Sequence, residues 1–232
     1  MTPLVLLHGF TQSACSFREL IAELSPEVVF APALLGHDGT ARRHGVETFD
    51  DEVDRIAELM RPLAAPAHLV GYSLGGRVAR GIAARHPDLL ARVSLVSAHP
   101  GLVDDGERRT RRAADARWRE LLEGEGIAAF VERWEALPLF ASQSEELRAA
   151  QRRARLEHDP RGLALSLEVL GLGVMPRYEV SDVPVTLVVG EHDDKFRTLA
   201  GDTAVVIEGA GHNPVLEQPR RLAQALGGGE DR

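Results

Sequence analysis

Short apolar runs alternate with longer helix-like segments along most of the chain, and this alternation restricts the possible folds more than any other feature. The runs are brief, rich in Val and Leu, and bounded by Gly or Pro, as is typical of buried strands. The predicted strands are Leu4–Leu7, Val28–Ala31, His68–Val70, Val93–Val96, Val185–Val189 and Ala204–Ile207. The predicted helices are Phe17–Leu24, Asp50–Leu63, Leu74–Arg85 and Pro214–Leu226. This order predicts an α/β fold in which a mostly parallel central sheet is flanked by helices on both faces.

One long segment interrupts the alternation. Residues 104–176 contain no convincing strand, are rich in arginine and have helical periodicity. Because the segment lies between two predicted strands, we expect a helical lid inserted into a core that residues 1–103 and 177–226 form. The Gly-rich tail, residues 227–232, is expected to be disordered.

Charge and composition exclude several classes of protein. A net charge of -8 argues against a nucleic-acid-binding protein, which would usually present a basic face. No apolar run approaches the ~20 residues of a membrane span, so we expect no membrane partner. The first residues do not resemble a secretory signal, and we therefore expect a cytoplasmic protein that is a monomer or a weak homo-oligomer. Cys15 is the only cysteine, which excludes an intrachain disulfide and a Cys-rich zinc site, and no metal site is predicted.

The most informative short motif is Gly71-Tyr72-Ser73-Leu74-Gly75. It follows a predicted strand and precedes a predicted helix, which is the context that gives the G-x-S-x-G pattern its meaning. A sharp turn at this point would expose the hydroxyl of Ser73 above the edge of the sheet. The motif therefore predicts a nucleophilic or basic serine.

Two further residues complete a candidate catalytic triad. Asp193 follows the predicted strand at 185–189, and His212 lies in a Gly-rich loop before the last predicted helix. The order Ser73, Asp193, His212 is that of the α/β-hydrolase fold. The imidazole would accept the serine proton, and the carboxylate would fix the imidazole tautomer. Asp193 is preferred to Asp194 because it lies closer to the end of the strand.

The loop after the first strand supplies a candidate oxyanion hole. His8-Gly9-Phe10 follows that strand directly, and Leu74 follows the serine. We expect the backbone N–H groups of Phe10 and Leu74 to stabilise negative charge that develops on the substrate.

Arg77 is unexpected beside the nucleophile of a simple esterase. Residues four apart on a helix are neighbours, and helical side chains tilt toward the N-terminus, so Arg77 should lean toward Ser73. Two interpretations stay open from this geometry. Arg77 forms an ion pair with a carboxylate of the protein, or it anchors a carboxylate of the substrate, which a guanidinium can bind in a bidentate manner.

Five motifs together resemble the menaquinone-pathway synthases that make 2-succinyl-6-hydroxy-2,4-cyclohexadiene-1-carboxylate (SHCHC). The motifs are an HGF loop at 8–10, a GYS-x-GGR elbow at 71–77, a lid segment at 134–142, a G-E-x-D-x-K-F run at 190–196 and a GAGH loop at 209–212. Members of that family have the α/β-hydrolase fold and eliminate pyruvate from SEPHCHC, the enolpyruvyl precursor of SHCHC. The resemblance implies a small polycarboxylate substrate, the triad named above, and no metal or organic cofactor.

The resemblance also implies a set of substrate-binding residues. These are Tyr72, Arg77, Trp134, Arg155, Lys195 and Arg117. Arg155 is the best match to a family arginine of the lid that binds carboxylates. Another family arginine should fall near 115–118, where this chain has Ala116 with Arg117 beside it. The other arginines at 108–112 are interpreted as a solvated face of a helix.

A serine carboxylesterase, a thioesterase or a carbon–carbon bond hydrolase is the alternative function. One fold hosts many chemistries, so the triad alone does not distinguish these enzymes from the synthase. A hydrolase of this kind would not need Arg77. A non-catalytic binding protein is a third possibility, which the complete triad disfavours.

Overall fold

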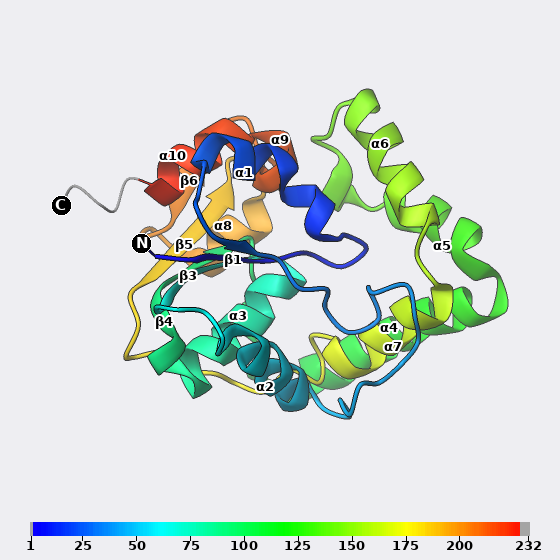
Figure 1. Ribbon diagram of the computed structural model, residues 1–232. Coiled ribbons are helices and arrows are strands. Elements are labelled where there is room, and N and C mark those ends of the chain that lie inside the picture. The colour runs from blue at the N-terminus through cyan, green and yellow to red at the C-terminus, as the bar shows by residue number, and fades with distance from the viewer. Residues whose placement is uncertain (1, 228–232) are drawn as a thin grey trace.

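A parallel sheet forms the centre of the molecule, with the strand order β2-β1-β3-β4-β5-β6 (Figure 1). The computed structural model describes residues 2–227, and every strand and helix given below lies in that range. The strands are β1 (Leu4–Leu7), β2 (Val29–Phe30), β3 (Ala67–Tyr72), β4 (Leu90–Val96), β5 (Val185–Gly190) and β6 (Val205–Ile207). The predicted parallel sheet is confirmed. The second strand is shorter than predicted because it forms an exposed edge, where Val28 and Val29 keep 47% and 37% of their surface.

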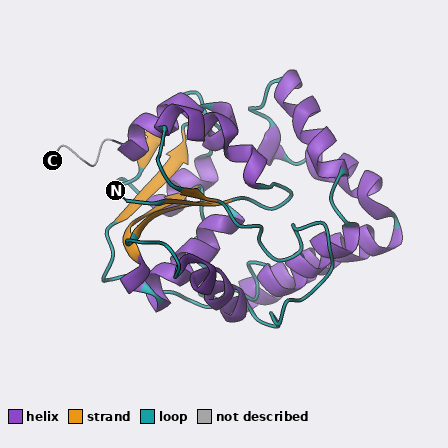
Figure 2. Cartoon of the chain, viewed as in Figure 1, coloured by secondary structure: helices purple, strands orange, loops and turns teal. Residues whose placement is uncertain are grey.

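Helices cover both faces of the sheet (Figure 2). One face carries α2 (Phe49–Met60) and α3 (Leu74–Arg85), and the other carries α1 (Arg18–Leu24), α9 (Pro214–Glu217) and α10 (Pro219–Gly227). Successive side chains of a strand point to opposite faces. Accordingly, Val5 and Leu7 of β1 join the core under α2 and α3, while Leu4 and Leu6 join the core under α1 and α10.

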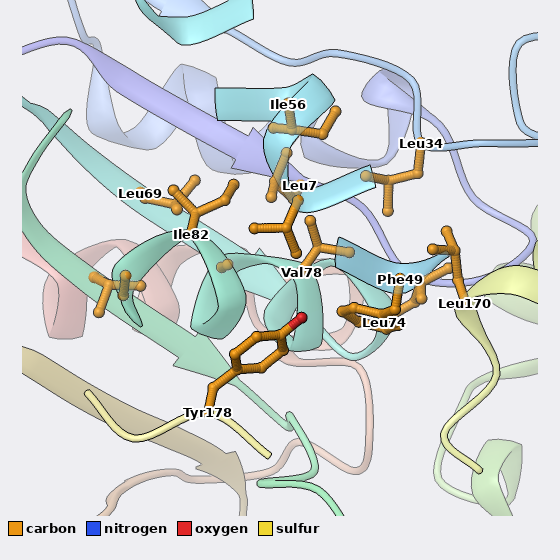
Figure 3. Packing of buried hydrophobic residues seen from close by; sticks show 14 of the residues in the cluster. Leu7, Leu34, Phe49, Ile56, Leu69, Leu74, Val78, Ile82, Leu170 and Tyr178 are labelled. Atoms are coloured by element: carbon orange, nitrogen blue, oxygen red, sulfur yellow. The ribbon is translucent and has the colours of Figure 1, made fainter. Parts of the chain in front are cut away.

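The larger core fixes the position of α3 on the sheet (Figure 3). Val78 and Ile82 of α3 pack with Ile56 of α2 and with Leu69 of β3, and all four side chains are fully buried. Because α3 begins directly after the serine of the predicted elbow, this packing also fixes the position of that serine.

The segment between β4 and β5 is helical. It contains α4 (Asp105–Gly124), α5 (Gly126–Glu135), α6 (Glu145–Leu156) and α7 (Pro160–Leu170), and within the described residues it has no strand. Each of three helices begins at a residue whose side-chain oxygen accepts a backbone N–H, namely Asp104, Ser144 and Asp159. α4, α5 and α7 share a small core of their own, which includes Leu122, Phe130 and Leu163.

The helical segment is also joined to the central core. Leu170, at the end of α7, belongs to the same apolar cluster as Leu74 and Phe49 (Figure 3).

Of the tail predicted to be disordered, residue 227 ends α10 and residues 228–232 lie outside the described residues. None of the helices in residues 2–227 has both the length and the apolar character needed to cross a bilayer.

Three histidines lie where the helical segment meets the central sheet. The rings of His8 and His37 are 4.9 Å apart, and the ring of His158 is 5.5 Å from that of His37. The backbone N–H of Leu34 donates to His8 Nε2, and that of Thr11 donates to His37 Nε2. Both rings therefore act as neutral acceptors. Burial lowers the pKa of His8 to about 4 and also lowers the pKa values of His37 and His158.

We expect the free energy of unfolding to fall as the pH decreases from about 6.5 toward 4. The unfolded chain binds a proton on His8 near pH 6.5, whereas the folded chain does so only near pH 4, and the lowered pKa values of His37 and His158 act in the same direction. Acid therefore favours unfolding in this window. Urea denaturation at several pH values measures the effect. His8→Asn should reduce the pH dependence, and replacement of the exposed His192 by Asn should not. A free energy that is constant between pH 7 and pH 5 would contradict the expectation.

Ile82→Ala should lower the free energy of unfolding by about 2–5 kcal/mol, because it leaves a cavity in a fully buried part of the core. Leu59→Ala is the matched control on a neighbouring helix. Its side chain is 44% exposed, and the change should cost about 0.5 kcal/mol or less. Equal losses of stability in the two variants would show that this core does not hold α3.

Candidate active site

Ser73 occupies a strained turn between β3 and α3. Its backbone has φ 51° and ψ -106°, a conformation that a residue with a side chain rarely adopts. The turn is held from both sides, since the Ser73 N–H donates to the Val96 carbonyl and the Gly75 N–H donates to the His8 carbonyl. A Cβ at Gly75 would lie 2.1 Å from the Leu7 carbonyl oxygen, so the close approach of α3 to β1 requires glycine there.

Asp193 and His212 meet Ser73 at the carboxyl edge of the sheet. His212 Nε2 lies 3.2 Å from Ser73 Oγ, and His212 Nδ1 lies 2.6 Å from Asp193 Oδ2. With its proton on Nδ1, the imidazole donates to the carboxylate and can accept the serine proton at Nε2. Asp193 and His212 are both buried, whereas the side chain of Asp194 is 96% exposed. Only Asp193 of the two neighbouring acids therefore contacts the histidine.

A cavity of about 380 Å³ opens beside Ser73 and His212. It lies next to the ends of β1 and β3, where the strand order changes direction, which is the usual place for a ligand in an open α/β sheet. Phe10 and Leu74, the two predicted oxyanion-hole residues, both contribute to its wall. Leu74 is the first residue of α3, so its N–H has no acceptor within the helix.

Arg77 faces this cavity. Its Nη1 donates to the Leu170 carbonyl at 2.6 Å, and among the described residues no carboxylate forms an ion pair with it. Burial lowers the pKa of Arg77 to about 9, and the nearby charge of Arg111 acts in the same direction. Arg77 is therefore a positively charged group at neutral pH that has no direct ion pair with a carboxylate among the described residues, although the charge of Asp115 acts on it from nearby. Of the two interpretations left open by the sequence, this geometry favours a substrate anchor.

Arg111 is a second cation on the cavity wall, and the sequence analysis did not select it. It lies on α4, and its Nε donates to Asp115 Oδ1 at 2.9 Å. The signal was present in the sequence, because positions 111, 115 and 118 share one face of a helix, and Trp118 marks that face as buried. Arg117 lies on another face of α4, is exposed, and does not reach the cavity.

The rest of the cavity wall adds further positive charge. Lys195 of α8 (Asp194–Ala200) lines the cavity, together with His99. Burial lowers the pKa of His99 to about 4, and the charges of Lys195, Arg77 and Arg111 act in the same direction. The cavity is therefore suited to an anionic ligand even though the chain carries a net charge of -8.

Aromatic side chains form the opposite wall. Trp134 of α5 lines the cavity, and its ring stacks on that of Phe130 and lies 5.3 Å from the ring of Phe10. Its indole Nε1 is buried and has no hydrogen-bond partner in residues 2–227.

Two other predicted contacts lie behind the cavity wall. Tyr72 is buried with its ring 5.7 Å from that of His212, where it supports the imidazole. Arg155 is 2% exposed, and its guanidinium pairs with Glu135 at 2.9 Å and lies over the ring of Phe140. Neither side chain lines the cavity, because each is engaged by the protein's own groups.

The described residues also contain no group of three or more His, Cys, Asp or Glu side chains that could hold a metal ion.

Comparison with known proteins identifies the family. Residues 4–225 match the Alpha/beta hydrolase family. The putative SHCHC synthase of Bacillus subtilis (strain 168) is 35% identical over 240 residues, which cover 96% of this chain and 88% of that protein. The SHCHC synthase of Enterobacter sp. (strain 638) is 33% identical over 231 residues, with 96% and 89% of the two chains covered.

Solved structures agree with this relationship. The structure of MenH from S. aureus is similar with a TM-score of 0.89 and 26% identity, over 98% of this chain and 92% of that one. A malate-bound thermophilic esterase from Thermogutta terrifontis is similar with a TM-score of 0.78 and 27% identity, over 97% and 88% of the two chains. The chain therefore belongs to the α/β hydrolase family and, within it, to the family of the SHCHC synthases.

Proposed function

We propose that this protein is an SHCHC synthase that eliminates pyruvate from SEPHCHC, and that it acts in the cytoplasm as a monomer or a weak homo-oligomer. The observation that carries the proposal is the cavity beside Ser73, where Arg77 and Arg111 face the site and Arg77 has no anionic partner of its own. The substrate of such a synthase carries several carboxylates, which these guanidinium groups bind.

In the proposed mechanism, Ser73 is the base. Its Oγ removes a proton from the ring while its own hydroxyl proton passes to His212 Nε2, 3.2 Å away. The electron pair of the broken C–H bond forms a ring double bond, and the C–O bond to the enolpyruvyl group breaks. The proton on His212 then reaches the departing enolpyruvate, which becomes pyruvate. Asp193 stabilises the transient imidazolium.

Negative charge spreads through the conjugated system during this step. Phe10 and Leu74 line the cavity beside the serine, and in this proposal their N–H groups stabilise the developing oxyanion. Arg77, Arg111 and Lys195 hold the carboxylates, and Trp134 covers the ring. The scheme forms no acyl-enzyme and needs neither a metal nor an organic cofactor.

In this proposal, the remaining predicted residues hold other parts of the site in place and do not bind the substrate. Tyr72 holds the ring of His212, and Arg155 fixes α6 against Glu135 and the loop after β1 through Thr11. Arg111 takes the substrate-binding role that the sequence analysis assigned to Arg117.

Ser73→Ala should reduce enzymatic pyruvate release from SEPHCHC by about a thousandfold or more, because it removes the base. Coupling pyruvate to lactate dehydrogenase gives the rate, with the spontaneous reaction subtracted. Ser181→Ala, at an exposed serine, is the control and should leave the rate unchanged. Wild-type protein that releases pyruvate no faster than the spontaneous reaction would end the proposal.

Arg77→Ala and Arg111→Ala should each lower kcat/KM for SEPHCHC by about 10- to 100-fold, since each removes charge-assisted hydrogen bonds worth ~1.5–3 kcal/mol. Arg85→Ala, on the same helix as Arg77 but paired with Asp54 at the surface, should have little effect. Hydrolysis of a neutral activated ester such as p-nitrophenyl acetate provides the second measurement. An ester hydrolase would show a burst with this ester and would be indifferent to Arg77→Ala.

A further inference from the structure

Asp115 is a buried carboxylate on the cavity wall, and the mechanism above does not use it. It lies on α4, is 5% exposed, and accepts one hydrogen bond from Arg111 Nε through Oδ1. Its other oxygen, Oδ2, is buried and has no hydrogen-bond partner among the described residues. Oδ2 packs closely against the backbone of Gly171, since a Cβ at that position would lie 2.7 Å from it.

The ionisation of this carboxyl depends on the arginines beside it. Burial raises the pKa of Asp115, and the charges of Arg111 and Arg77 oppose that effect. A buried carboxylate with one hydrogen bond and one unpartnered oxygen has few other sources of stabilisation. If the arginine charges are neutralised by another anion, the charged form of Asp115 loses most of what supports it.

A substrate carboxylate is such an anion, because it must bind to the same two arginines. Arg77 gives one N–H to the Leu170 carbonyl, and Arg111 gives only its Nε to Asp115, so both retain donors for a ligand. Two negative charges would then compete for two cations inside a partly enclosed cavity. Of the two, Asp115 is the one that is covered from water and can be neutralised by a proton.

We propose that Asp115 takes up a proton when a substrate carboxylate binds to Arg77 and Arg111, so that the cavity binds its polycarboxylate together with one proton. The inference rests on the proposed function, because that function supplies the carboxylate. Substrate affinity is then coupled to pH through the substrate-binding step, separately from the acid–base chemistry of His212.

Other charged groups also lie near Asp115. His99, Lys195 and His212 face the same cavity. Arg112, Arg119 and Glu168 line a cleft between α4 and α7 on the other side of Asp115, and Arg119 pairs there with Glu168. His99 is the main competitor, because its pKa of about 4 would rise beside a bound anion.

Calorimetric titration of wild-type protein with SHCHC, the dicarboxylate product, tests the proposal directly. Near pH 7.5, heats measured in buffers of different ionisation enthalpy give the number of protons taken up on binding. Uptake approaching one proton for each SHCHC bound is expected. Binding without proton uptake would overturn the proposal, and this result needs no variant that might fold poorly.

Asp115→Asn mimics the protonated carboxyl and should abolish the uptake. The KM of the wild type for SEPHCHC should rise with pH by up to tenfold per unit, as linkage to one proton requires, whereas the KM of the variant should be low and independent of pH. The kcat values should be similar. An Asp115→Asn variant that keeps the wild-type pH dependence, or whose KM is raised at every pH, would contradict the proposal.

Two further variants test whether Asp115 or a neighbouring group takes up the proton. Glu168→Gln removes a carboxylate from the same α4–α7 contact without touching the cavity, and it should leave the proton uptake unchanged. His99→Gln should also leave it unchanged, and loss of uptake in this variant would assign the proton to His99 and refute the role of Asp115. Failure of wild-type protein to release pyruvate would refute the proposed function instead, which distinguishes the two failures.

Discussion

At Ser73 the backbone turns from the last residue of β3 into α3 in a conformation with positive φ, and the remainder of the site depends on that turn. The strain persists because hydrogen bonds to the backbone on both sides and the buried face of α3 fix it. Since parallel strands end at one edge of the sheet, the same turn brings the serine beside the loops that carry Asp193, His212 and Phe10. Arg77 is placed by the same helix, one turn after the serine. The side chains of Ser73 and Arg77 are thus positioned by a single element.

Charge determines what this site can accept. A serine with its histidine and aspartate suits any carbonyl substrate. Arg77, which has no direct ion pair, and Arg111, which gives only its Nε to Asp115, favour an anion in a cavity partly shielded from water. The protein's own carboxylates are mostly engaged elsewhere, as Glu135 is with Arg155 and Glu168 is with Arg119. Asp115 is the acid that reaches the cavity, and it satisfies only one donor of Arg111.

The sequence predicted the sheet and the meeting of Ser73, Asp193 and His212, but not the full set of cavity residues, and the difference has a physical cause. Ser73 and Asp193 directly follow strands, and His212 lies in the loop between β6 and α9, so periodicity and chain order are enough to bring the three together. Which side chains of α4 and α6 reach the cavity depends on how these helices rotate and pack, and local spacing in the sequence does not reveal this. Arg155 was expected at the substrate, yet it is buried against Glu135, while Arg111 was expected to be solvated, yet it faces the cavity.

Under the proposed function, the inserted helices do more than cover the site. In a hydrolase of this fold, the serine must form a covalent bond and then release it to water, and the pocket needs only to position a carbonyl group. In the proposed elimination no covalent bond to the enzyme forms, so catalysis depends on holding a polyanion with one C–H bond against Ser73 Oγ. Arg77 alone, on the core, fixes one point of such a molecule. A second point fixes its orientation, and under the proposed function Arg111 of α4 supplies that point from the inserted helices.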